Sequence, residues 1–180
     1  MNPRVLCLLI PGFEEIETVA PVDLLRRAGA TVVLASVTGE PLVRGRCEMV
    51  LQADASLADV VGQEFDLLLI PGGPGVKLLR SDGRAARIAR EFVDRGRPVA
   101  AICAAPLVLA DAGLLAGRRY TAHSSVWKEL PEAVEHEAVV EHGPLITSQG
   151  AGTAVTFGLA LVQRLFGLPK GDEIARAIML

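Results

Sequence analysis

The stretch "RPVAAICAAPLVLADAGLL", residues 97–115, carries the transition from one kind of secondary structure to another. Residues 98–102 form a short apolar run without polar alternation, which is typical of a strand buried on both faces. Cys103 ends that run, and residues 106–112 then follow a helical pattern that starts at a proline and stops before Gly113. The stretch therefore predicts a strand followed directly by a helix, with Cys103 at the corner between them.

The same alternation extends in both directions along the chain. Other apolar runs that end at Gly, Pro or polar turns predict further strands at residues 5–10, 31–37, 67–70 and 145–148. Helical patterns predict helices at residues 15–28, 81–95 and 153–166 and a last short helix at 171–180. Residues 39–51 and 137–148 are expected to form hairpins or extended excursions. This alternation predicts one α/β domain over residues 1–180, with a mostly parallel sheet and helices on both faces.

Composition and charge exclude several classes of protein. A net charge of -3 without a stripe of Lys and Arg argues against nucleic-acid binding. The apolar runs are far shorter than the roughly 18 residues of a membrane span, and the first one stops at Pro11, so neither a membrane protein nor a signal peptide is expected. The three cysteines, at 7, 47 and 103, match neither a disulfide framework nor a CxxC-type metal site. We therefore expect a cytoplasmic protein without a metal.

Cys103 is the leading candidate for chemistry. A strand-to-helix corner exposes the side chain at the sheet edge and directs N–H groups and a helix N-terminus at it, and such surroundings favour the nucleophilic thiolate. The alternative is a buried, inert cysteine, which is a frequent fate of this residue type. Cys7 lies inside the first predicted strand and is expected in the core, whereas Cys47 is expected to be a surface or interface thiol.

Three acidic residues follow the first predicted strand. Glu14 and Glu15 are explained by the preference of carboxylates for the first turn of a helix. Glu17 is flanked by Ile16 and Val19, which allows it to point inward, towards the strand ends. An inward carboxyl group near a thiol can share a proton with it and act as a general acid or base.

Two other strand ends supply further candidates. Gly72 and Gly73 follow the strand predicted at residues 67–70, and their N–H groups could stabilise an oxyanion, although a tight turn explains the pair equally well. His123 lies in "YTAHSS", which is expected to follow a further short strand, about 20 residues after Cys103. A lone histidine is more often structural or solvated than catalytic. The carboxyl ends of parallel strands meet at one sheet edge, so we expect these groups to lie near Cys103.

Six short segments in this order resemble one known family. They are "GFEEIETVAPVDLLRRAG", "DASL", "DLLLIPGG", "AAICAAP", "TAH" and "LITSQGAGT". They are similar to the ThiJ/PfpI superfamily, in the branch that holds the parkinsonism-associated protein deglycase and its bacterial relatives, and the likeness covers nearly the whole chain. The resemblance implies a flavodoxin-like three-layer sandwich, usually a homodimer, that works without a cofactor.

The resemblance also implies roles for individual residues. Cys103 corresponds to the nucleophile, Glu17 to its carboxyl partner and His123 to the nearby imidazole, while Gly72 and Gly73 match backbone-amide positions. The implied substrate is a small aldehyde or dicarbonyl such as methylglyoxal, or a glycated protein, with the amides of Gly73 and Ala104 holding the oxyanion. The alternative is a redox-sensing stress protein or chaperone that uses the oxidisable Cys103.

The chain departs from the family pattern at several positions. Ala105 stands where glycine is commoner, which the corner tolerates if the φ of Ala105 is negative. Ala104 stands where the peptidase branch places a histidine directly after the cysteine, which argues against a peptidase. Cys47 takes the position of a hairpin arginine found at the dimer interface of some relatives, which argues against anion binding there. Gln52 stands where other relatives carry an interface cysteine.

Overall fold

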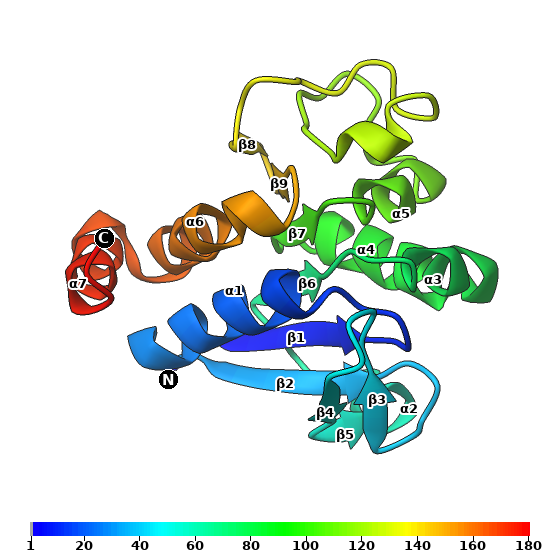
Figure 1. The fold of residues 1–180 in the computed structure, drawn as a ribbon, viewed down its shortest axis with the longest axis horizontal. Helices are drawn as coiled ribbons and strands as arrows, with labels where there is room; N and C mark the ends of the chain where they lie inside the picture. Colours follow the sequence, from blue (N-terminus) through cyan, green and yellow to red (C-terminus); the bar gives the residue numbers. More distant parts are fainter. Residues whose placement is uncertain (1) are drawn as a thin grey trace.

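The computed structural model describes residues 2–180 and has a mostly parallel sheet between two layers of helices (Figure 1). The main sheet has the strand order β5-β2-β1-β6-β7-β9-β8. Its strands are β1 (Arg4–Leu9), β2 (Thr31–Ser36), β5 (Ala55–Ser56), β6 (Leu67–Ile70), β7 (Val99–Ile102), β8 (Val139–His142) and β9 (Leu145–Ser148). All neighbouring pairs in this sheet are parallel except β8 and β9. The predicted α/β fold with a flavodoxin-type sandwich is confirmed.

Helices cover both faces of this sheet. One layer contains α1 (Glu15–Ala28), α6 (Ala154–Phe166) and α7 (Leu168–Ala177), whose apolar side chains join one buried cluster. The other layer contains α2 (Leu57–Val60), α3 (Val76–Asp82), α4 (Arg84–Asp94) and α5 (Pro106–Asp111). Two short 3-10 turns are also present, η1 (Ser124–Val126) and η2 (Ala151–Thr153).

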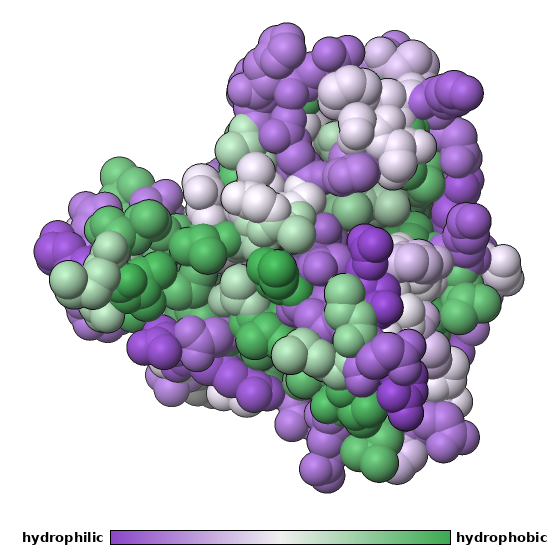
Figure 2. All heavy atoms as spheres, viewed as in Figure 1, coloured by the Kyte–Doolittle hydropathy of each residue, from purple (hydrophilic) through white to green (hydrophobic). Residues whose placement is uncertain are grey.

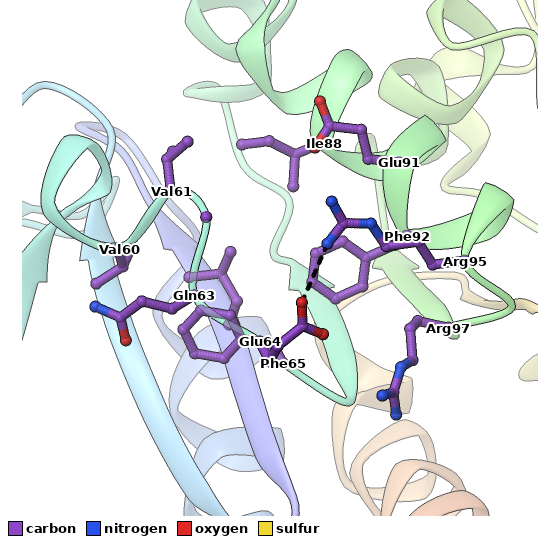
Figure 3. Close-up of a pocket in the computed structure, with 12 residues that line it drawn as sticks. Val60, Val61, Gln63, Glu64, Phe65, Ile88, Glu91, Phe92, Arg95 and Arg97 are labelled. Carbon is purple, nitrogen blue, oxygen red and sulfur yellow. Dashed lines mark hydrogen bonds and ion pairs between the residues drawn. The ribbon is translucent and has the colours of Figure 1, made fainter.

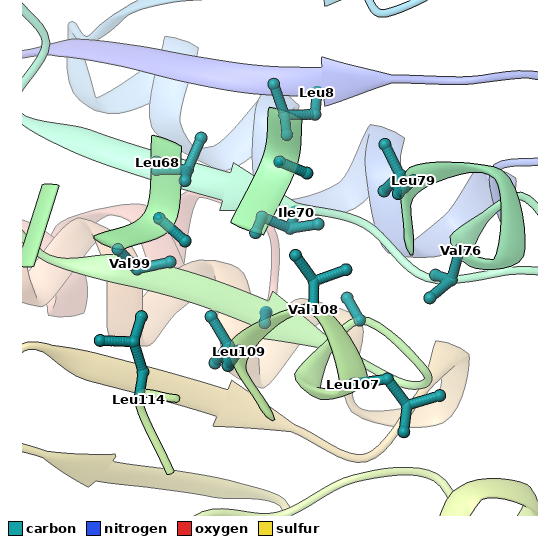
Figure 4. Close-up of a cluster of buried hydrophobic side chains, with 14 of the residues drawn as sticks. Leu8, Leu68, Ile70, Val76, Leu79, Val99, Leu107, Val108, Leu109 and Leu114 are labelled. Carbon is teal, nitrogen blue, oxygen red and sulfur yellow. The ribbon is translucent and has the colours of Figure 1, made fainter. Parts of the chain in front are cut away.

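The central strands are buried on both faces, as the absence of polar alternation predicts. Every residue of β6 and β7 is buried. Figure 4 shows Leu68 and Ile70 of β6 packed with Val108 and Leu109 of α5 in one of the two clusters. Burying a side chain of this size contributes about 1.5–3 kcal/mol, so the core holds these strands firmly. The carboxyl ends of β6 and β7 are therefore rigid supports for whatever follows them.

Two expectations from the sequence are wrong. Residues 81–95 do not form one helix, because Gly83, with φ 75°, ends α3 and precedes α4. The short strand expected directly before His123 is absent. Residues 112–123, all described by the structure, form turns and backbone without regular secondary structure. That segment is attached by single hydrogen bonds instead, from Thr121 N to Thr147 Oγ1 at 2.9 Å and from His123 N to Cys103 O at 2.9 Å.

Both predicted hairpins are present. β3 (Leu42–Arg44) and β4 (Val50–Gln52) pair antiparallel as a separate two-stranded sheet, and β8 pairs antiparallel with β9. The backbone of the first hairpin reaches the start of α1, where Gly12 N donates to Arg44 O at 2.8 Å and Cys47 N donates to Glu15 Oε1 at 2.8 Å. The hairpin is thereby held beside the carboxyl end of β1. In the described part of the chain, no helix combines the length and apolar composition needed to cross a membrane.

Candidate functional site

Cys103 directly follows β7 and adopts a left-handed backbone conformation, with φ 66°. Such a conformation in a residue other than glycine costs about 1–3 kcal/mol. Two backbone hydrogen bonds hold it, from Cys103 N to Ser148 O and from His123 N to Cys103 O, each 2.9 Å long. At about 0.5–1.5 kcal/mol each, they offset the strain. Ala105 has φ -62°, so the alanine in place of the commoner glycine fits the corner.

Glu17 points inward from the first turn of α1. The Glu14 carboxylate caps this helix by accepting the Glu17 N–H at 2.8 Å, and Glu17 itself is only 1% exposed. Its carboxyl group meets Cys103 at Gly72, where an added Cβ would collide with Glu17 Oε2 and would lie 2.6 Å from the Cys103 Cβ. The missing side chain at Gly72 therefore leaves the room in which the acid and the thiol approach each other.

The Glu17 carboxyl group and the Cys103 thiol are two acidic groups that lie together in a buried site. Burial raises the pKa of Glu17 to about 7; contact with Cys103 opposes this, and the charge of Glu14 adds to it. Burial raises the pKa of the Cys103 thiol to about 12, and the charge of Glu17 and its contact with the thiol add to this increase. The backbone N–H groups of Gly73 and Ala104 lower the same pKa but do not cancel the increase. The corner alone therefore does not favour the thiolate, contrary to the expectation from sequence. A thiolate requires Glu17 to hold the proton, because two adjacent buried charges repel each other.

The geometry leaves Glu17 free to hold that proton. Among residues 2–180, its Oε2 atom is buried and has no partner with standard hydrogen-bond geometry. An ionised oxygen without a partner would be costly there, whereas a protonated one can turn its O–H towards the nearby sulfur. Arg46 of the β3–β4 hairpin contributes a positive charge that lowers the pKa of Glu17.

His123 lies at the mouth of the site. Its Nδ1 accepts the Ser125 N–H at 3.2 Å and lies 2.9 Å from the Ser125 Oγ, which leaves the proton of the neutral ring on Nε2. An added Cβ on Gly150 would lie 3.2 Å from His123 Cδ2 and 3.6 Å from Glu17 Oε1. The imidazole and the carboxyl group therefore flank the same glycine, although they come from segments far apart in the sequence.

A pocket of about 540 Å³ opens over these groups. Its lining includes five of the six site residues predicted from sequence, Cys103, Glu17, His123, Gly73 and Ala104. The sixth, Gly72, is buried beside Glu17 and Cys103. The structure therefore brings the predicted residues together, although His123 reaches the site without the strand expected before it.

The pocket also contains residues that sequence reasoning missed. Arg46 supplies a positive charge from the hairpin, one position before Cys47. Lys77 and Arg80 come from α3, and Glu129 from the segment after η1. For the last three residues the one signal in the sequence is position, because each lies within a few residues of Gly73 or His123.

A second pocket, of about 50 Å³, lies at the opposite ends of the strands. Figure 3 shows its lining, in which Phe65 and Phe92 lie near the pair formed by Arg95 and Glu64. The six predicted site residues are all absent from this lining. Among residues 2–180, no cluster of three His, Cys, Asp or Glu side chains is placed to hold a metal.

Comparison with known proteins relates the chain to one family. The sequence model of the DJ-1/PfpI family matches residues 3–164. Protein dj-1beta of Drosophila melanogaster is 35% identical over 184 residues, covering 100% of this chain and 98% of that protein. YraA of Bacillus subtilis, whose name assigns it provisionally to the cysteine proteases, is 37% identical over 153 residues, covering 83% of this chain and 90% of that protein.

Solved structures agree with this relationship. The crystal structure of Drosophila melanogaster DJ-1beta superimposes with a TM-score of 0.92 and covers 100% of this chain and 99% of that one. The structure of oxidized Toxoplasma gondii DJ-1 superimposes with a TM-score of 0.93 at 32% identity and covers 99% of this chain and 98% of that one.

Proposed function

Because the chain belongs to the DJ-1/PfpI family, we propose that it is a cofactor-independent enzyme that uses Cys103 as a nucleophile on methylglyoxal-like dicarbonyls. The observation that carries the proposal is the meeting of Cys103 and Glu17 at Gly72, on the floor of a pocket that His123 also lines. A thiol, a carboxyl group with a pKa near 7 and an imidazole are the groups that a thiol-based isomerisation of an aldehyde needs.

The first step forms a carbon–sulfur bond. The ionised Glu17 takes the proton of the Cys103 thiol as the sulfur attacks the aldehyde carbon, and the alkoxide oxygen then takes this proton from Glu17, which leaves a hemithioacetal and an ionised Glu17. The N–H groups of Gly73 and Ala104 already face the sulfur, where they lower the pKa of Cys103. The same two donors are placed to hydrogen-bond the oxyanion that forms on the neighbouring carbon.

The second step moves a proton between two carbons. The ionised Glu17 removes the hydrogen of the former aldehyde carbon, and the resulting enediol is reprotonated on the adjacent carbon to give a thioester of lactate. Water hydrolyses this thioester, which releases lactate and restores the thiol. The Nε2–H of His123 is the donor available at the pocket mouth to position or polarise the second carbonyl.

The proposal is tested by incubating the purified protein with methylglyoxal, without glutathione, and following lactate. Reversal of early glycation on protein amines begins with the same attack on a carbonyl-derived carbon, so glycated proteins are further candidate substrates. A peptidase activity is not proposed, despite the name of the YraA relative, because Ala104 follows Cys103 and the histidine at the site is His123.

A redox-sensing role is the second candidate, and the oxidized state of the Toxoplasma gondii relative favours it. Here peroxide oxidises Cys103 stepwise to a sulfinate, and the protonated Glu17 stabilises the new anion. We expect mild peroxide to modify Cys103 before Cys7, which is fully buried, and before Cys47, which is exposed but lies outside the lining of the Cys103 pocket. Mass spectrometry of tryptic peptides measures the order, and earlier oxidation of Cys7 or Cys47 would remove the sensor hypothesis.

We also propose that the chain forms a homodimer through α1 and the β3–β4 hairpin. Large apolar side chains on these elements are exposed, including Ile16 at 53%, Leu42 at 63% and Met49 at 63%. Figure 2 shows hydrophobic patches along α1 and beside the hairpin on one face, and contiguous patches of this kind mark interaction surfaces. Sedimentation at micromolar concentration is expected to give twice the mass of the 19.0 kDa chain, and a monomer would contradict the proposal.

A further inference from the structure

We propose that the Cys103 pocket selects small dicarbonyls that carry a carboxylate, and that Lys77 of α3 recognises this anionic group. The inference rests on the proposed function and names the substrate class of the same site. Size is its first support. The pocket, at about 540 Å³, falls in the range of roughly 300–1,000 Å³ that holds drug-sized ligands. A three-carbon dicarbonyl attached to Cys103 leaves the part near α3 unfilled.

The charged side chains beside α3 are mostly paired with one another. Arg80 donates to both carboxylate oxygens of Asp111, at 2.8 and 2.9 Å, and to Glu129 Oε2 at 2.8 Å. These contacts raise the pKa of Arg80 and fix its guanidinium. Glu129 is thereby engaged, and Glu14 is engaged as the helix cap of α1. These paired groups are poor partners for a ligand, because a ligand would have to displace existing hydrogen bonds.

Two cations in the lining remain without such partners. Within residues 2–180, Arg46 and Lys77 take part in none of the ion pairs. Both line the pocket, where Glu14 also takes part in no described ion pair and Glu17 binds a proton with a pKa near 7. With Glu17 protonated, the lining holds three cations, Arg46, Lys77 and Arg80, against the two anions Glu14 and Glu129. Its charge is therefore positive, which favours an anionic ligand and raises its local concentration.

The two cations have different places. The charge of Arg46 reaches Glu17 and lowers its pKa, so Arg46 belongs to the reacting end of the pocket. Lys77 lies on the exposed side of α3, one helical turn before Arg80, and lines the pocket from that helix. A carboxylate two or three carbons beyond the dicarbonyl can meet its ammonium group.

The test compares two substrates that share the reacting group. 4,5-Dioxopentanoate is a 2-oxoaldehyde with a remote carboxylate, and its product by the proposed reaction is 2-hydroxyglutarate, whereas methylglyoxal yields lactate. We expect the ratio of kcat/KM for 4,5-dioxopentanoate to that for methylglyoxal to fall about tenfold in Lys77→Met, which corresponds to about 1.4 kcal/mol. Lys77→Arg is expected to restore the ratio, and added salt is expected to lower it in the wild type. Lys128→Met is the matched control, since this exposed lysine lies outside the pocket lining.

The outcomes separate the two proposals. If the wild type makes no lactate from methylglyoxal and no 2-hydroxyglutarate from 4,5-dioxopentanoate, the proposed function is wrong. If the wild type turns over methylglyoxal but the ratio is the same in Lys77→Met and Lys128→Met, the inference about Lys77 is wrong and the proposed function stands. A third substrate, 3-phosphooxy-2-oxopropanal, distinguishes the anion: a preference for it that Lys77→Met removes, without one for 4,5-dioxopentanoate, would overturn the carboxylate assignment. Titration of Cys103→Ser protein with 2-hydroxyglutarate measures binding without turnover, and Lys77→Met is expected to weaken it about tenfold.

Discussion

Cys103→Ser is expected to lower glutathione-free lactate formation from methylglyoxal on the order of 10³-fold or more, which corresponds to about 4 kcal/mol of transition-state stabilisation. Serine keeps the size of the side chain and its place beside Gly73 and Ala104, but its hydroxyl is far more weakly acidic than a thiol. The covalent route through a hemithioacetal is then lost, because Glu17 no longer has a thiol with which it can exchange a proton.

The control for this substitution is Cys47→Ser. Cys47 is exposed and lies outside the lining of the pocket, so its loss is expected to leave lactate formation unchanged. Thermal unfolding of both variants checks that the folds are intact. Lactate rates that are equal in the wild type and in Cys103→Ser would exclude the thiol mechanism.

Glu17→Gln is expected to change activity and stability in opposite directions. Glutamine cannot release or accept the proton that the isomerisation moves twice, so turnover falls by about 10²–10⁴-fold, the usual contribution of a general acid or base. Glutamine also removes a buried acid whose ionised form is poorly solvated. The protein therefore becomes more stable at the pH at which Glu17 would be charged.

The pH range follows from the two pKa values. The pKa of Glu17 is raised from 4.5 to about 7 by folding. Below pH 4.5 both the folded and the unfolded chain are protonated, and the wild type and Glu17→Gln are equally stable in this respect. As the pH rises from 4.5 to 7 the unfolded chain ionises first, so the wild type loses up to about 3 kcal/mol, and the loss is complete well above pH 7.

Urea unfolding at pH 4.5 and pH 8 measures this difference. Glu17→Gln is expected to gain about 2 kcal/mol over the wild type at pH 8 and to show little gain at pH 4.5. Glu135→Gln, at an exposed glutamate away from the pocket lining, is expected to show no such dependence. Full turnover in Glu17→Gln would remove Glu17 from the reaction, and a less stable variant at pH 8 would contradict the raised pKa.

The parts of the fold that sequence predicts well are those with a strong local signal. β6, β9 and α1 lie where the apolar runs and the stop at Gly29 place them. The break at Gly83 was missed because an amphipathic pattern continues on both sides of a glycine, and only its left-handed φ ends α3. The strand expected before His123 is absent because this segment makes single hydrogen bonds to Thr147 and Cys103 in place of the repeated backbone hydrogen bonds of a sheet.

The candidate site was predictable in its membership but not in its electrostatics. Strand ends and a family resemblance identify Cys103 and Glu17, because parallel strands deliver their carboxyl ends to one edge. The resemblance alone identifies His123, since the strand expected before it is absent. Burial and mutual distance decide the proton balance between Cys103 and Glu17, and neither is encoded in the spacing of residues. Arg46 and Lys77 were missed for a related reason. A charged residue in a hairpin or on a helix is expected to face solvent, and the sequence does not show that a pocket lies beside it.

The backbone of Cys103 has a consequence for how the molecule folds. Its left-handed conformation is held by Ser148 and His123, which are distant in sequence, rather than by its neighbours. Long-range contacts of this kind form late, since the loops between them must close first. The corner therefore acquires its shape only when β9 has joined the sheet, and a nascent or partly folded chain carries Cys103 as an ordinary, flexible thiol. The shape of the corner is thus a property of the completed chain, because β9, the last strand in the sequence, supplies one of the two hydrogen bonds that hold it.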